Sequence, residues 1–185
     1  MRKALLTTIA AVVFSIPTAS SALASEAAAG AVDSSFGQNG TTTVALGSWA
    51  GASAVVVQPD GSIVTAGEAN ASGENVIVST RMTPNGSLDP SYGTGGIVTV
   101  AINGSAGVDS DAGLALEPDG KILIAGSGRT PGDGPLAFAA VRLDPNGSLD
   151  QSFGSGGITT VAIGTEAIAN AVVIEPDGKI VLGGV

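Results

Sequence analysis

The chain has 185 residues and is both apolar and acidic: 44% of the residues are hydrophobic, 12% are charged, and the formal net charge is −9. It contains no Cys and no His, which excludes disulfides, thiol nucleophiles, the Ser-His-Asp triad and zinc or haem held by His. Seven basic residues against sixteen acidic ones argue against nucleic acid as a partner, because its binding requires Lys and Arg to neutralise phosphates.

The first 24 residues have the three parts of a secretory signal peptide. Met1-Arg2-Lys3 is a short basic start, residues 4–16 form an apolar run, and Ala22-Leu23-Ala24 is a small-residue cleavage pattern. A membrane span needs about 20 apolar residues, so we expect cleavage after Ala24 and a mature chain without a membrane span. The predicted location is therefore secreted, periplasmic or cell-surface, with residues 25–32 as a short linker.

The rest of the chain is a repeat with a period of about 60 residues. An Asp-x-Ser-aromatic-Gly block begins at Asp33, Asp89 and Asp150, at steps of 56 and 61 residues. Markers that recur in fixed order predict a supersecondary unit that stacks on copies of itself. The units are residues 33–88, residues 89–149 and a partial third unit at 150–185. Each unit also holds a Pro-Asp-Gly turn motif, whose prolines and glycines are Pro59, Pro118, Pro176, Gly61, Gly120 and Gly178.

Each complete unit is expected to hold four short strands. In the second unit, residues 96–102 are apolar and β-branched, residues 112–116 and 121–126 flank a turn, and residues 138–143 lead into Pro145-Asn146-Gly147. Apolar runs around such a turn predict a hairpin. Four antiparallel strands per repeat are typical of a β-propeller blade, and nearly continuous apolar runs favour blades packed face to face over a linear array. We therefore predict an all-β fold with about two and two-thirds blades of an incomplete ring.

These blocks resemble the delta-60 repeat, a family of bacterial exported and surface proteins. The resemblance rests on the Leu-Asp-x-Ser-[Phe/Tyr]-Gly-x-Gly-Gly block, the Pro-Asp-Gly-Lys turn and the Arg-Leu-x-Pro-Asn-Gly-Ser-Leu-Asp block, and it covers residues 33–185. The first copy departs from it, with Val32 in place of the Leu and Ser62 where Lys121 and Lys179 stand. The resemblance implies a β-propeller and assigns no catalytic residues.

The third unit has three predicted strands and lacks its fourth, because the sequence stops at Val185 within a hairpin strand. Propellers close with about four to eight blades. We therefore expect the sequence to be a fragment of a longer protein that supplies the further blades. The alternative is that other chains supply them through oligomerisation.

Most ionisable residues recur at equivalent positions, which is typical of turns and strand edges, whereas a catalytic site needs different groups that converge on one point. We expect no enzyme activity and no cofactor. Calcium is the alternative that we keep, because Asp144, Asn146, Ser148 and Asp150 place oxygen atoms at every second residue. An Asx-type turn explains the same pattern.

One aromatic residue recurs in each unit, as Phe36, Tyr92 and Phe153. We expect this residue to pack each blade against its neighbour, while the glycines that follow it allow a close approach. Its predicted role is structural.

Two functions of different classes remain open. The first is a non-catalytic exported scaffold that binds protein or glycan at the cell surface through its variable loops. The second is a lactonase-like hydrolase with a carboxylate or metal site at the central channel, for which the non-repeated acids Glu68, Glu74, Asp109 and Asp111 are candidates. The missing catalytic groups favour the scaffold.

Overall fold

The computed structural model describes residues 8–12, 30–71, 73–102, 112–132 and 134–185. Within these ranges the chain forms twelve β-strands. No helix in the described ranges has the length and apolar character needed to cross a membrane. The strands are β1 (Thr8–Val12), β2 (Thr41–Ala45), β3 (Ala50–Val57), β4 (Ile63–Ala71), β5 (Glu74–Met82), β6 (Ile97–Val100), β7 (Gly113–Leu116), β8 (Ile122–Arg129), β9 (Leu136–Leu143), β10 (Ile158–Val161), β11 (Ala169–Ile174) and β12 (Ile180–Gly184).

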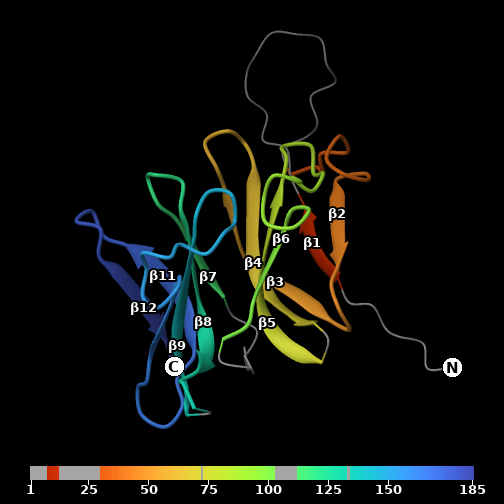
Figure 1. Ribbon diagram of the computed structural model, residues 1–185. Helices are drawn as coiled ribbons and strands as arrows, with labels where there is room; N and C mark the ends of the chain where they lie inside the picture. The colour runs from red at the N-terminus through yellow and green to blue at the C-terminus, as the bar shows by residue number, and fades with distance from the viewer. Residues whose placement is uncertain (1–7, 13–29, 72, 103–111, 133) are drawn as a thin grey trace, which may run out of the picture.

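Two four-stranded antiparallel sheets form the body of the molecule (Figure 1). The first sheet has the order β3-β4-β5-β6 and the second the order β7-β8-β9-β10, while β11 pairs with β12 and β1 pairs with β2. β7 contacts β3 and β4 of the first sheet, and β11 contacts β7 and β8 of the second. The sheets therefore follow one another as blades, and the described strands form no closed ring. This architecture confirms the predicted all-β fold of propeller-like blades.

The repeat in the sequence and the sheet in the structure are offset by one strand. The strand that follows each aromatic-glycine block pairs with the sheet of the preceding unit: Ile97 of β6 lies opposite Thr80 of β5, and Ile158 of β10 lies opposite Val141 of β9. The third unit has three strands as expected, but they do not share a blade. β10 completes the second sheet, and β11 and β12 begin a third.

Apolar residues fill the space between successive sheets because the side chains of a strand alternate between its two faces. Val64 of β4 and Ile122 of β8 belong to one buried cluster between the first and second sheets. Leu123 of β8 points to the other face and packs with Val172 of β11. Seven consecutive residues of β8, from Ile122, are buried, which explains why this run shows no polar alternation.

The two ends of this series of sheets carry exposed apolar residues. Val55 and Val57 of β3 are 61% and 65% exposed, and Val173 of β11 is 58% exposed. Their counterparts in the second sheet, such as Leu114 and Leu116, pack against a neighbouring sheet. The exposed valines thus mark the faces on which a neighbouring blade would pack.

Candidate functional site

The Pro-Asp-Gly turns close the hairpin between the first two strands of a sheet. In the first of them, the Ser62 amide donates a hydrogen bond of 2.8 Å to Asp60 Oδ1, and Gly61 has a φ of +84°. Glycine is required there because other residues rarely adopt positive φ. The turns with Pro118 and Pro176 are built in the same way, with Gly120 and Gly178 at φ of +86° and +83° and with Asp119 and Asp177 accepting from the amides of Lys121 and Lys179.

A second turn in each of the two complete units, the Pro-Asn-Gly turn, joins consecutive sheets. Gly37 donates a backbone hydrogen bond of 2.8 Å to the Asn85 carbonyl, and Gly93 donates one of 2.8 Å to the Asn146 carbonyl. Gly86 has a φ of +85°, and a Cβ at this residue would lie 2.9 Å from the Gly37 nitrogen. The turn can therefore rest on the aromatic-glycine block only because residue 86 is a glycine.

The recurring aromatic residue lies between successive sheets at each junction. Tyr92 is fully buried, its hydroxyl lies 2.8 Å from Ser79 Oγ, and the Arg81 guanidinium stands 4.8 Å above its ring. Burial raises the pKa of Tyr92 to about 12, although the Ser79 hydrogen bond and the Arg81 charge act in the opposite direction. Phe36 is also buried, against Ile63 and Met82 of the first sheet.

Phe153 is less enclosed than the other two aromatic residues. It packs as a partly buried residue in the cluster between the second sheet and the β11-β12 pair. The Arg142 guanidinium stands 4.5 Å above its ring, as Arg81 does above Tyr92. The arginine-aromatic contact is thus repeated, while the degree of burial differs.

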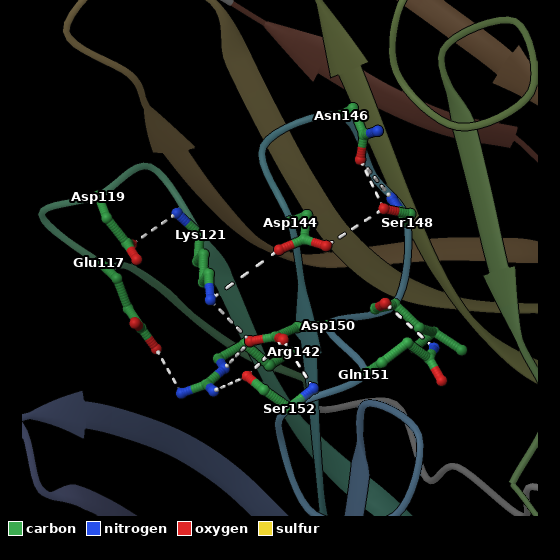
Figure 2. Close-up of polar contacts among 11 residues, drawn as sticks. Glu117, Asp119, Lys121, Arg142, Asp144, Asn146, Ser148, Asp150, Gln151 and Ser152 are labelled. Carbon is green, nitrogen blue, oxygen red and sulfur yellow. Dashed lines mark hydrogen bonds and ion pairs between the residues drawn. The ribbon is translucent and has the colours of Figure 1, made fainter.

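A network of charges surrounds Asp150, the first residue of the third unit (Figure 2). Its carboxylate is 2.7 Å from Arg142 Nε and 2.9 Å from Lys121 Nζ, and Ser152 Oγ donates to it at 2.7 Å. The Ser152 hydrogen bond, followed by those from Lys121 and Arg142, holds the pKa of Asp150 well below its usual range. Glu117 lies 3.7 Å from Arg142 and adds a second negative charge.

The four oxygen-bearing residues considered for calcium do lie together, but they form a turn (Figure 2). Asn146 Oδ1 accepts hydrogen bonds from the amide and the hydroxyl of Ser148 at 3.0 and 2.7 Å, and Asp144 accepts from the same hydroxyl at 3.3 Å. The Asp150 carboxylate already forms ion pairs with Lys121 and Arg142. A calcium ion would have to displace both cations, so the donor set fits an Asx-type turn better than a metal. In the described part of the chain, no group of three or more acidic side chains is placed to hold a metal ion.

The boundary between the first and second units repeats the central ion pair with fewer charges. Arg81 Nε donates to Asp89 at 2.8 Å and Arg81 Nη2 donates to Ser91 at 2.9 Å. The same guanidinium also donates to the carbonyl of Pro145 in the following unit. Ser62 stands where Lys121 stands in the second unit. The arginine therefore links its own turn to the neighbouring sheet, which is a structural role.

The described acidic residues that were candidates for a central catalytic site do not lie together. Glu68 is buried on β4, opposite Ile77 of β5, whereas Glu74 is exposed at the start of β5. Asp109 and Asp111 lie outside the described residues. Within the described ranges, the geometry thus brings no set of catalytic groups together at these positions.

A polar groove lies where the Pro-Asn-Gly turn of the first unit meets β2. Its volume is about 500 Å³. Thr42 Oγ1 donates to the Gly86 carbonyl at 2.7 Å and so ties the two walls together. Hydroxyl and amide side chains dominate the lining, which includes Ser35, Gln38, Thr41, Thr42, Thr43 and Asn85. We call this the threonine groove.

The equivalent groove of the second unit has a similar volume, about 580 Å³, but a different chemistry. Ile97 and Val98 of β6 stand at the positions of Thr41 and Thr42, and Leu149 adds a further apolar wall. The threonine groove can therefore donate and accept hydrogen bonds where its counterpart offers mainly methyl groups. Our sequence analysis missed this site, although the run Thr41-Thr42-Thr43 is a visible departure from Ile97-Val98-Thr99.

Comparison with known protein families supports the propeller class. The family model described as "Domain of unknown function (DUF5122) beta-propeller" matches residues 58–92 and 117–153. Each matched segment runs from a Pro-Asp-Gly turn to the next recurrent aromatic residue, so the match covers the two complete copies of the most regular part of the repeat. No curated protein matches the chain. The fold and the family match together define a β-propeller repeat domain.

Proposed function

We propose that the chain is an exported, non-catalytic β-propeller module of the delta-60 type, which binds a neutral glycan at the bacterial cell surface in the threonine groove. The observation that carries this proposal is the difference in chemistry between two equivalent grooves. Repeat positions that serve only packing would be free to remain apolar, as they are in the second unit. Glycan recognition, in contrast, requires side chains that both donate and accept hydrogen bonds, and hydroxyl and amide groups do both.

Charge supports a neutral ligand. The groove lining contains no charged side chain, and the net charge of the chain is −9, which repels polyanions. The positive charges of the two junctions, Arg81, Lys121 and Arg142, are engaged by Asp89, Asp150 and Glu117. These cations are thus engaged at turns and strand ends, and Arg81 also reaches the Pro145 carbonyl of the following sheet, which supports a binding module in preference to an enzyme.

The matched pair of grooves provides the test of glycan binding. The protein is applied to a panel of immobilised neutral oligosaccharides, and Thr42→Val is compared with the unmodified chain. We expect Thr42→Val to lose binding, because it gives the groove the valine found at position 98. The control Val98→Thr adds a hydroxyl to the second groove and leaves binding at the first unchanged. Binding that survives Thr42→Val, or capture of proteins with no oligosaccharide bound, would contradict the proposal.

Export is tested separately. The basic start, the apolar run of residues 4–16 and Ala22-Leu23-Ala24 support cleavage after Ala24. Expression in a bacterium, followed by mass spectrometry of the exported fraction, is expected to give a chain that begins at Ser25. A chain that stays inside the cell with Met1 intact would contradict export without affecting the groove.

A further inference from the structure

The hydrogen bonds of the threonine groove determine which of its polar atoms donate and which accept. Thr42 Oγ1 lies 2.7 Å from the Gly86 carbonyl oxygen. A carbonyl oxygen has no proton, so the single proton of the Thr42 hydroxyl is committed to this bond. The remaining lone pair of Thr42 Oγ1 can only accept a hydrogen bond, and Thr42 is therefore an acceptor on the β2 wall of the groove.

Ser35, which also lines the groove, has the same polarity. Its hydroxyl donates to Asp33 Oδ1 at 2.6 Å, because an ionised carboxylate only accepts. The free lone pair of Ser35 Oγ can again only accept a hydrogen bond from a ligand.

Asn85 supplies the opposite polarity from the Pro-Asn-Gly turn. The Ser87 amide donates to Asn85 Oδ1 at 3.2 Å, and the Thr83 hydroxyl donates to the same oxygen. A backbone N–H can only donate, so the oxygen of the Asn85 amide must face the turn and Nδ2 must face away from it. Within the part of the chain that the structure describes, no hydrogen bond engages Nδ2. Asn85 is exposed and lines the groove, and it therefore offers two N–H donors to a ligand.

The second unit repeats the turn but not this arrangement of the groove. Asn146 Oδ1 faces the amide and the hydroxyl of Ser148, and its nitrogen points away from them (Figure 2). The lining of the second groove includes Gly147 but not Asn146, and Val98 takes the place of Thr42. An asparagine donor opposite a threonine acceptor is thus found in the first groove and not in the second.

The donor and the acceptor belong to different walls, and this favours an amide as the group that they bind. A secondary amide is almost always trans, so its N–H and its carbonyl point in opposite directions. It can give its proton to one wall and accept from the other, whereas a hydroxyl donates and accepts at one atom. Thr41, Thr42 and Thr43 also bring methyl groups to the lining, which suit the methyl of an acetyl group.

We propose that the threonine groove selects neutral glycans that carry an acetamido group. Asn85 Nδ2 donates to the acetamido carbonyl, and Thr42 Oγ1 accepts from the acetamido N–H. The group is uncharged, in agreement with a lining that has no charged side chain. This inference rests on the proposed glycan binding and names the chemical group that the groove recognises.

Two oligosaccharides that differ in one substituent test the selectivity of the full chain. The first is a β-1,4-linked oligomer of 2-acetamido-2-deoxyglucose, and the second is the glucose oligomer of the same linkage and length. We expect the acetamido oligomer to bind about ten-fold or more tightly, because the glucose oligomer leaves the groove's donor and acceptor without the amide that spans them. The dissociation constants are measured by titration calorimetry.

Asn85→Asp tests the donor. The variant keeps an oxygen for the Ser87 amide, as Asp60 does for the Ser62 amide in the Pro-Asp-Gly turn, but it has no N–H to donate. We expect this variant to lose the preference for the acetamido oligomer. Asn146→Asp is the matched control, because it adds the same charge to the equivalent turn outside the threonine groove, and it should keep the preference. Thermal unfolding of both variants shows that they are folded.

The outcomes separate this inference from the proposed function. Equal binding of the two oligomers, or a preference that survives Asn85→Asp, overturns the selection of an acetamido group and leaves neutral glycan binding intact. Loss of the preference in Asn146→Asp as well would also overturn it, because the effect would then come from charge. If the unmodified chain binds neither these oligomers nor any other neutral oligosaccharide, the proposed function fails and this inference fails with it.

Discussion

The junction between the first and second sheets and the junction between the second sheet and the β11-β12 pair bury their aromatic residues in different ways. In the first, Tyr92 is enclosed and its hydroxyl meets Ser79 at 2.8 Å. In the second, Phe153 has no hydroxyl, and Ala140 stands at the position of Ser79. Both members of the pair have changed together, because a buried hydroxyl without a partner costs about 1–3 kcal/mol. An aromatic ring fills this site at both junctions. A serine lies beside the ring that has a hydroxyl, and an alanine lies beside the ring that has none.

The ion pairs differ in a similar way between the repeats. The arginine-aspartate pair is present in both, as Arg81 with Asp89 and Arg142 with Asp150. Only the second unit adds Lys121 as a second cation on the same carboxylate. The arginine above the aromatic ring is therefore the constant element of the junction, and the lysine is an addition to it.

The largest expected effect is the loss of an aromatic side chain. Tyr92→Ala should lower the free energy of unfolding by about 3–5 kcal/mol, because it leaves a cavity in a closed core. Phe153→Ala should lower it by less, since Phe153 is only partly buried beside the two-stranded sheet. Urea unfolding of both variants measures the difference. Equal losses would show that the second junction is as closed as the first.

The next effect concerns the carboxylates. Asp150→Asn should lower the melting temperature more than Asp89→Asn, because Asp150 pairs with two cations and Asp89 pairs with one. The pKa of Asp150 is lowered in the folded state, so its contribution is present above the ordinary value of 3.8 and is lost as the pH falls below it. The difference between the variants should therefore shrink in acid. Asp33→Asn is the control, because its carboxylate is held by Ser35. Equal melting temperatures of Asp150→Asn and Asp89→Asn at neutral pH, or a difference that stays the same in acid, would contradict this interpretation.

A smaller effect is expected from exchanging the polar pair. Tyr92→Phe should cost about 1 kcal/mol, since Ser79 loses one of its two hydrogen-bond partners and keeps only the Thr65 carbonyl. Adding Ser79→Ala should recover part of this loss, because the double variant has the residue pair found at the next junction, Ala140 and Phe153. The coupling energy is measured with a double-mutant cycle in urea. Additive losses would mean that the two hydroxyl groups do not act as a pair.

The smallest effect appears only in alkali. The chain has a single tyrosine, so the ultraviolet absorbance of phenolate reports Tyr92 alone. Its pKa is raised from 10.0 to about 12 in the folded chain. The contribution of Tyr92 to stability is thus complete below pH 10 and is lost as the pH rises toward 12. Titration with a midpoint near 10 would show that the ring is open to solvent, and Tyr92→Phe supplies the baseline.

Much of the fold could be predicted because its signals are local. The Pro-Asp-Gly motif specifies a turn through the fixed φ of proline and the positive φ of glycine, and this placed the hairpin at Gly120 in the second unit. The charged network around Asp150 could not be predicted in the same way. Lys121 and Asp150 are 29 residues apart, and only the pairing of β8 with β9 brings them to 2.9 Å.

The sequence alone determined the repeat, its strands and its turns, because these depend on residues within a few positions of one another. Only the tertiary structure decided how the strands are divided among the sheets. β6 and β10 join the preceding sheet because their ladder partners lie in the unit before them. The threonine groove likewise depends on the contact between Thr42 and Gly86, which are 44 residues apart. The place of β1 depends on the pairing of Thr8–Val12 with β2. No local pattern specifies which distant backbone edge a strand will meet, since that choice depends on the packing of the sheets.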